Sequence, residues 1–298
     1  MTRKERIRRN MLLIAGNSKS GIQNALEHPG VDSVILDLED LVAPSKKDEV
    51  RASVCELIKS GKFQEKGIEV VVRINHPDTP YYIDDIHMLM EAKPDMLRIP
   101  KVECREDVLC VNSLVNAYEK KMGYEENTVL LMAAVESAKG ILNTFEIATC
   151  CPRIIGMALS AADYCKDMKV LRTKEGMELD WARGMLLNSA RAAGVFAMDT
   201  SFTFVDAEAL EKEAKRAKAM GFDGKTVGGG ANPEMVAIVN KIFSPTDEQI
   251  AFAKKVLALE KEYEASGKAV SREGDMTLDK PIVEQYRQIL RSAGETVD

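Results

Sequence analysis

The sequence predicts an α/β fold, a (β/α)8 TIM barrel with a C-terminal helical extension. Three observations lead to this expectation. Short apolar runs of 4 to 7 residues alternate with longer helix-like segments, which is the rhythm of βα repetition. Eight such runs occur within roughly 230 residues, and eight is the strand number of a closed barrel. Most runs are unbroken rather than alternating, as is typical of parallel strands buried on both faces.

The predicted strands and helices follow in order along the chain. The strands cover residues 11–15, 34–38, 70–74, 96–99, 129–135, 154–159, 195–198 and 224–227. Ser45 and Asp48 form an SxxD helix start after Pro44. Asp206 is placed to cap a helix that ends at Gly221. A doubly wound sheet remains the alternative, because these signals do not prove that the sheet closes.

The pattern changes towards the C-terminus. A charged helix over 247–266, a polar stretch over 267–275 and an amphipathic helix over 281–292 follow the last predicted strand. We therefore expect a barrel domain over 1–243 and an extension over 244–298. The polar stretch is composed like a mobile loop, so the extension is expected to fold over the barrel mouth or to reach a neighbouring subunit.

Composition and charge exclude several classes of function. The chain has 298 residues and a net charge of -6, which gives no general basic field for nucleic acid. No apolar run approaches the ~20 residues of a membrane span, and the run behind the basic N-terminus is too short for a signal-peptide core. The 6 cysteines show no CxxC spacing, which indicates a reducing compartment. We expect a cytoplasmic protein that binds neither nucleic acid nor membrane.

Polar side chains follow six consecutive predicted strands at their carboxyl ends, where a barrel assembles its active site. They are Asp37, Glu39 and Asp40 at the end of the second strand, Arg73 and Asn75 at the end of the third, Lys101 and Glu103 at the fourth, Glu136 at the fifth, Asp163 at the sixth and Asp199 at the seventh. One such charge would mean little, because strand ends often carry a solvated carboxylate. Six strands in succession predict a functional cluster.

Glu136 and Asp163 are candidate metal ligands. They lie 27 residues apart, at the predicted ends of adjacent strands whose axes would be ~4.8 Å apart. Mg²⁺ commonly takes one or two carboxylates and leaves its other positions to water and substrate oxygens. The alternative is that each carboxylate caps the helix that follows it.

Arg73 and Asn75 are candidate substrate-binding residues. They lie two residues apart in VVVRIN, so strand alternation predicts that they face the same way. A guanidinium in an apolar strand is costly unless it is paired, and its planar fork matches a carboxylate. The residues alone leave two interpretations open, a substrate-carboxylate site or a structural salt bridge to Asp37 or Glu39.

Gly228, Gly229 and Gly230 follow the eighth predicted strand. Successive backbone N–H groups without a Cβ can form an anion-binding nest, and barrels often bind phosphate after strands 7 and 8. The triplet is therefore a candidate cofactor-binding site. A flexible loop is the alternative.

Several motifs occur in one order along nearly the whole chain. They are RRNMLLIAGN, VILDLEDLVAPSKKDEVR, VVRIN, LRIPKVE, AAVESAKGILN, IIGMALSAADY, EGMELDWAR, AGVFAMDT and GFDGK. Together they resemble the citrate lyase β-subunit family, within the superfamily of HpcH/HpaI aldolases and malyl-CoA lyases. The resemblance implies a Mg²⁺-dependent barrel, usually a homotrimer, that cleaves citryl groups carried by coenzyme A or by an acyl carrier protein. The products would be oxaloacetate and an acetyl thioester.

The resemblance also implies roles for individual residues. Glu136 of VES and Asp163 of AADY match metal ligands, and Arg73 of VRIN matches the arginine that holds the keto-acid carboxylate. Asp37 and Glu39 match an acidic pair near the metal-bound waters, with an expected catalytic role.

A further catalytic residue is implied in the extension. Asp279 of MTLDKP resembles an aspartate that, in relatives, closes over a neighbour's site and handles a proton. The glycine triplet stands where the family usually has IHP or INP soon after GK, so the residues that recognise the thioester arm depart from the pattern.

Other functions remain open at this stage. One alternative is a malyl-CoA or methylmalyl-CoA type lyase, or a thioesterase, at the same site. Another is a non-catalytic subunit that binds an acyl carrier. Citrate lyase α and acyl-carrier subunits are the partners that the resemblance implies, and the carrier's phosphopantetheine is the alternative to coenzyme A.

Overall fold

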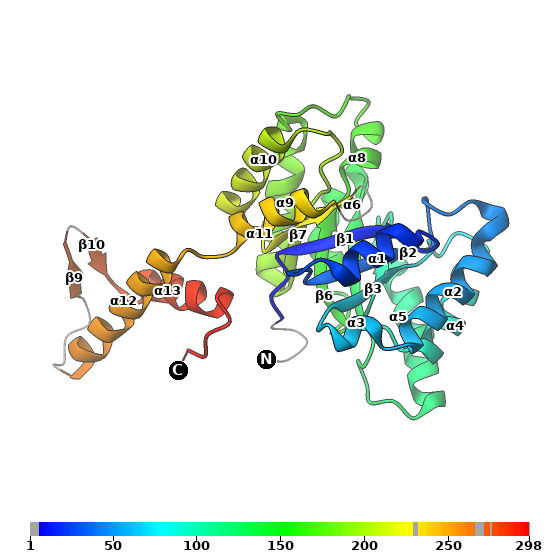
Figure 1. Cartoon of the computed structure of the whole chain (residues 1–298), viewed down its shortest axis with the longest axis horizontal. Helices are drawn as coiled ribbons and strands as arrows, with labels where there is room; N and C mark the ends of the chain where they lie inside the picture. The colour runs from blue at the N-terminus through cyan, green and yellow to red at the C-terminus, as the bar shows by residue number, and fades with distance from the viewer. Residues whose placement is uncertain (1–5, 229–231, 266–270, 275, 298) are drawn as a thin grey trace. The chain divides into compact units, whose positions relative to one another are not determined.

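Eight parallel strands close into a barrel in sequence order, with β1 hydrogen-bonded to both β2 and β8 (Figure 1). This computed structural model describes residues 6–228, 232–265, 271–274 and 276–297. The strands are β1 (Asn10–Ala15), β2 (Ser33–Asp37), β3 (Glu69–Arg73), β4 (Met96–Ile99), β5 (Leu130–Val135), β6 (Ile154–Leu159), β7 (Phe196–Asp199) and β8 (Gly224–Val227). The predicted (β/α)8 barrel is confirmed.

Helices connect the successive strands and surround the barrel (Figure 1). They are α1 (Lys19–Glu27), α2 (Lys47–Lys59), α3 (Lys62–Glu65), α4 (Tyr82–Ala92), α5 (Arg105–Met122), α6 (Ala138–Leu142), α7 (Thr144–Thr149), α8 (Ala161–Asp167), α9 (Asp180–Ala193), α10 (Ala207–Met220) and α11 (Pro233–Phe243), with 3₁₀ turns η2 (Pro44–Lys46) and η3 (Met177–Leu179). As predicted, Asp206 caps α10 by accepting a hydrogen bond from Ala209 N, and α10 ends at Gly221 with φ 110°.

The barrel interior is filled by apolar side chains from alternate strand positions. This core consists of Met11, Ile35, Val71, Met96, Leu130, Met132, Ile155, Ala158 and Met198. Because successive side chains in a strand point to opposite faces, these residues fix the direction of their neighbours. Asp37 and Arg73, two residues beyond Ile35 and Val71, therefore also face the interior. Asp199, one residue after Met198, faces the helices.

Asp199 therefore faces away from the barrel interior, and its place in the predicted functional cluster was wrong. Its carboxylate accepts hydrogen bonds from Arg183 of α9 at 2.8 and 3.0 Å, and from Lys225 Nζ of β8 at 2.8 Å. Lys225 also contacts Glu213 of α10 at 2.6 Å. All four side chains are buried, so this network joins the last two strands to their helices.

Replacing Asp199 with asparagine should lower the free energy of unfolding by about 3 kcal/mol or more, because it leaves buried cations undercompensated. Burial raises the pKa of Asp199, but Lys225 and Arg183 outweigh this and hold it at about 2. The carboxylate thus contributes stability that is present above the unfolded value of 3.8 and is lost as pH falls towards 2. Urea unfolding at pH 7 and at low pH tests both effects, with the exposed Asp84→Asn as control. Equal stability of the Asp199 and Asp84 variants at pH 7 would contradict the assignment.

The chain divides into two compact units, Met1–Asn240 and Lys241–Asp298. The second unit contains α12 (Asp247–Ala265), β9 (Ser271–Glu273), β10 (Met276–Leu278) and α13 (Lys280–Ser292). β9 and β10 pair antiparallel, so part of the stretch expected to be a loop forms a strand. Val256, Leu278 and Val283 form a small core of this unit. Among the described residues, no helix combines the length and the apolar character needed to cross a membrane.

Candidate active site at the barrel mouth

Arg73 lies inside the barrel at the carboxyl end of β3, two residues beyond the core residue Val71. Its Nε donates to Asp37 Oδ1 at 2.6 Å, and its Nη2 donates to Asp37 Oδ2 at 2.8 Å. Asp37 is the residue paired with Arg73 in the register of β2 and β3. The salt bridge that the sequence left open as an alternative therefore exists. It engages one edge of the guanidinium and leaves N–H donors on Nη1 and Nη2.

Asp37 is fully buried, and its two oxygens accept four hydrogen bonds. Besides Arg73, the donors are the backbone N–H groups of Glu39, at 3.0 Å, and Leu41, at 2.9 Å. Burial raises the pKa of Asp37, but these hydrogen bonds outweigh it and hold the pKa below its usual value. With its oxygens occupied, Asp37 is placed to position Arg73 rather than to act on a substrate.

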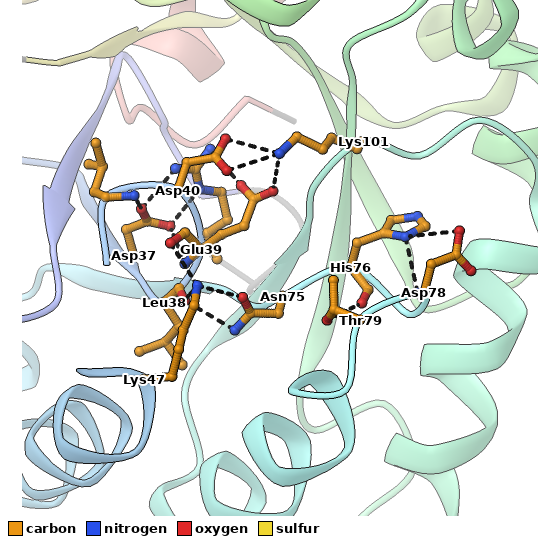
Figure 2. Close-up of polar contacts among 12 residues, drawn as sticks. Asp37, Leu38, Glu39, Asp40, Lys47, Asn75, His76, Asp78, Thr79 and Lys101 are labelled. Atoms are coloured by element: carbon orange, nitrogen blue, oxygen red, sulfur yellow. Dashed lines mark hydrogen bonds and ion pairs between the residues drawn. The ribbon is translucent and has the colours of Figure 1, made fainter. Parts of the chain in front are cut away.

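Glu39 lies on the loop after β2, where Lys101 and Lys47 contact it (Figure 2). Arg73 is the third positively charged residue in contact with Glu39. The Glu39 carboxylate contacts Lys101 Nζ at 2.7 Å and Arg73 Nη1 at 3.1 Å. Lys101 also reaches Asp40 at 3.0 Å, and Lys47 Nζ donates to the backbone oxygen of Glu39 at 2.8 Å. Lys101 was singled out only as a strand-end charge, and its position over this loop was not predicted.

Asn75 does not join Arg73 in the barrel interior. β3 ends at Arg73, so alternation no longer fixes the direction of Asn75, and the predicted shared face is not observed. Its Oδ1 accepts from Lys47 Nζ at 2.7 Å, and its Nδ2 donates to Leu38 O at 3.0 Å (Figure 2). Nδ2 also donates to Asp85 Oδ2 of α4 at 2.7 Å. These contacts support a structural role for Asn75 in fixing the loop after β2.

Glu136 follows β5 directly and is 3% exposed. In the part of the chain that the structure describes, neither of its carboxylate oxygens has a hydrogen-bond partner. Burial raises the pKa of Glu136 to about 7, although the charges of Arg98 and Arg73 oppose the shift. A buried carboxylate without a partner is strongly unfavourable unless a cation completes its environment. This arrangement fits a metal ligand.

Asp163, the second predicted ligand, lies in the first turn of α8 rather than at the end of β6. It is partly exposed, and no described residue pairs with its carboxylate. The capping alternative is not observed, because Ser137 is the N-cap of α6 and Ser160 that of α8. The described residues contain no group of three or more His, Cys, Asp or Glu that could hold a metal. Two carboxylates would suit Mg²⁺, which leaves its other positions to water and substrate.

Arg98 is a residue of this site that the sequence analysis missed. It lies on β4 in register with Arg73 and is 4% exposed. Burial and the charge of Arg73 lower the pKa of Arg98 to about 10. The signal was present in the sequence, because MLRI places a basic residue in an apolar strand just as VVVR does. The charged residues that follow this strand, Lys101 and Glu103, indicated the site there instead.

A cavity of about 400 Å³ lies beside the loops that follow β7 and β8. Its lining residues are Ser201, Phe202, Thr203, Phe204, Val205, Asp206, Ala207, Leu210, Gly228, Asn232, Glu234, Met235 and Ile238. Of the glycine triplet, Gly228 contributes to this lining, and Gly229 and Gly230 lie outside the described residues.

Asp279 lies in the second unit, at the N-terminus of α13. Its Oδ1 accepts a hydrogen bond from Ile282 N at 3.1 Å, so its carboxylate caps the helix. Any proton-transfer role for Asp279 must be compatible with this capping contact.

Comparison with known proteins places these residues in a wider context. The family model described as HpcH/HpaI aldolase/citrate lyase matches residues 9–228. The chain is 39% identical to the citrate lyase subunit beta of Leuconostoc mesenteroides, with 97% of this chain and 94% of the relative covered. It is 30% identical to an L-malyl-CoA/beta-methylmalyl-CoA lyase of Cereibacter sphaeroides, with 94% and 93% covered. A crystal structure of CitE from Mycobacterium tuberculosis, in complex with magnesium, acetoacetate and coenzyme A, is similar with a TM-score of 0.74 at 27% identity, covering 96% of this chain and 98% of that one.

Proposed function

Because this chain belongs to the HpcH/HpaI aldolase/citrate lyase family and is a carbon–carbon lyase, we propose that it cleaves a citryl thioester to oxaloacetate and an acetyl thioester. The observation that carries the proposal is the buried, unpartnered carboxylate of Glu136 beside Arg73 and Arg98. Such a site accommodates a cation and an oxyanion together, as the cleavage of a hydroxy acid requires. The relatives named citrate lyase subunit beta support the citryl group as substrate.

Glu136 and Asp163 are the residues that would hold Mg²⁺. When bound, the cation would supply Lewis-acid chemistry at the hydroxyl and carboxylate oxygens of the substrate. The proposal draws support from the M. tuberculosis protein, which was solved with magnesium.

The remaining side chains bind and orient the substrate. Arg73, held on one edge by Asp37, would present its remaining donors to the keto-acid carboxylate. Glu39 lies at 3.1 Å from Arg73 Nη1 and is fixed by Lys101, so it would help to orient this guanidinium beside the reacting hydroxyl. Asp279 would carry a proton from the substrate hydroxyl to the carbon that becomes the methyl group of the acetyl product, while the extension excludes water.

The thioester arm would occupy the cavity beside Gly228. Apolar side chains such as Phe202, Phe204 and Met235 line it, together with polar ones such as Asp206 and Asn232. A pantetheine chain has both characters, so the cavity supports either coenzyme A or an acyl-carrier phosphopantetheine as the acyl carrier.

Replacing Arg73 with lysine should lower kcat/KM for the citryl thioester by roughly 1 to 3 kcal/mol equivalent, because lysine keeps the charge but loses the planar fork. Steady-state kinetics measures the effect, and circular dichroism checks that the variant is folded. The control is Lys174→Arg, which exchanges lysine and arginine at an exposed position and should leave kcat/KM unchanged. If Arg73→Lys is kinetically normal, Arg73 serves only its salt bridge with Asp37.

A malyl-CoA type lyase at the same site is the second candidate, since relatives of that activity are 30% identical. Assays with citryl-CoA and malyl-CoA, each with Mg²⁺ and with a chelator, decide between them. We expect oxaloacetate from citryl-CoA, loss of activity with the chelator and recovery on adding Mg²⁺. Glyoxylate from malyl-CoA with an inert citryl-CoA would establish the second candidate, and inactivity towards both would favour a carrier-binding subunit.

We further propose that the protein acts in the cytoplasm as a homotrimer, with citrate lyase α and acyl-carrier subunits as partners. Large apolar side chains on the barrel surface are available for such contacts, for example Leu171, 88% exposed, and Trp181, 56% exposed. Sedimentation of the protein alone tests the homotrimer, and sedimentation with those subunits tests their binding.

A further inference from the structure

The barrel mouth contains a second guanidinium whose role is not explained by the metal site or by Arg73. Arg98 of β4 is in register with Arg73 of β3 and with Met132 of β5. Met132 belongs to the interior core, so Arg98 also faces the interior. Two guanidinium groups therefore lie next to each other on the same face, which is unfavourable unless anions separate or neutralise them.

The hydrogen bonds of Arg98 leave most of its donors unused. Nη2 donates to Ser160 Oγ at 3.1 Å, while Nε and Nη1 are buried and have no partner among the described residues. Both carboxylate oxygens of Glu136 are likewise buried without a hydrogen-bond partner among the described residues. Within the described part of the chain, Arg98 and Glu136 form no ion pair with each other. Leaving opposite charges buried and unpaired is costly, so this arrangement indicates that ligands satisfy them separately.

The charges around Arg98 indicate the sign of its ligand. Arg73 is balanced by its bidentate contact with Asp37. The carboxylates of Glu39 and Asp40 are balanced by Lys101 and by Lys47, whose Nζ donates to Glu39 O. A divalent cation held by two carboxylates would leave the metal site neutral. Arg98 then remains as an uncompensated positive charge beside the substrate, and its unused donors match a carboxylate in geometry.

We propose that Arg98 binds a second carboxylate of the substrate and thereby selects acyl thioesters with two free carboxylates over those with one. A citryl thioester has two, and a malyl thioester has one. Ser160 acts as a positioning residue, because its hydroxyl holds Nη2 and directs the other donors of the guanidinium. The inference rests on the proposed function, since it concerns the substrate of the same site.

The test compares the binding of two keto acids in the presence of Mg²⁺. Oxaloacetate carries two carboxylates and pyruvate carries one, so calorimetric titration of both isolates the second carboxylate without turnover. Replacing Arg98 with methionine keeps an unbranched apolar stem but removes the charge and the N–H donors of the guanidinium. We expect Arg98→Met to weaken oxaloacetate binding by about tenfold or more and pyruvate binding by less than about threefold.

Two further variants keep the outcome interpretable. Arg98→Lys retains a charge, so it should fold if the methionine variant does not, and it should show a smaller selective loss of oxaloacetate binding. The exposed Arg105→Met should bind both acids as the unaltered protein does. Equal losses for the two acids in the Arg98 variants, or no loss for either, would overturn the proposal.

The outcome is separable from that of the proposed function. If the unaltered protein binds oxaloacetate through Arg98 but does not cleave citryl-CoA, the proposed reaction fails and the role of Arg98 stands. If it cleaves citryl-CoA while Arg98→Met leaves the preference for oxaloacetate over pyruvate unchanged, the role of Arg98 fails alone.

Discussion

Glu136→Gln should abolish lyase activity and lower the affinity for Mg²⁺ by well over about tenfold. Glutamine has nearly the same shape as glutamate but lacks the negative charge that would bind the cation. Because the carboxylate is buried and unpartnered without a metal, its neutralisation should not destabilise the metal-free protein. Asp163→Asn should have the same effect on metal binding. Calorimetric titration with Mg²⁺ and thermal unfolding without metal measure the two properties.

Glu103→Gln is the matched control for this experiment. Glu103 follows β4 near the barrel mouth, but its carboxylate is engaged by Ser137 Oγ at 2.8 Å and by Lys139 Nζ at 3.1 Å. Its replacement should leave Mg²⁺ affinity unchanged. Unchanged Mg²⁺ binding in both the Glu136 and the Asp163 variants would contradict the metal assignment.

Asp279→Asn should be nearly inactive although it keeps the helix cap. Asparagine accepts the hydrogen bond from Ile282 N about as well as aspartate does, so α13 should remain stable, but it cannot exchange a proton at neutral pH. Asp279→Ala removes both properties and should also be inactive. Steady-state kinetics with a citryl thioester measures the loss. Full activity in Asp279→Asn, with loss only in Asp279→Ala, would show that the cap alone matters.

Complementation tests whether Asp279 acts on a neighbouring subunit. Arg73→Ala and Asp279→Ala proteins should each be nearly inactive, and mixed oligomers should regain partial activity because some sites combine an intact barrel with an intact extension. Co-expression produces the mixtures, and mass spectrometry confirms them. Confirmed mixtures without recovery would contradict action between subunits.

The barrel could be predicted because its signals are local. Eight apolar runs, the Asp206 cap and the Gly221 terminus are each properties of a short segment. The hairpin of β9 and β10 could not be predicted in the same way. Ser271–Glu273 is polar, and its strand depends on pairing with Met276–Leu278 rather than on its own composition.

The site was predicted in part, because strand ends indicate position but not direction. Asp37 and Asp199 both end apolar strands. Asp37 lies two residues after the core residue Ile35 and therefore faces the interior. Asp199 lies one residue after the core residue Met198 and therefore faces the helices. The direction of each aspartate depends on which residues of its strand face the core, and these are known only once the register of the strands is known. Arg98 lies in an apolar strand as Arg73 does, but the charged residues that follow its strand, Lys101 and Glu103, indicated the site there instead.

The products formed from citryl-CoA test the central claim most directly. Incubation of the protein with citryl-CoA and Mg²⁺, followed by NMR of the quenched mixture, separates cleavage of the carbon–carbon bond from hydrolysis of the thioester. A lyase acting at the Glu136 site releases oxaloacetate and acetyl-CoA in equal amounts, and Glu136→Gln releases neither. Citrate and free coenzyme A as the products, or unchanged product formation by Glu136→Gln, would contradict it.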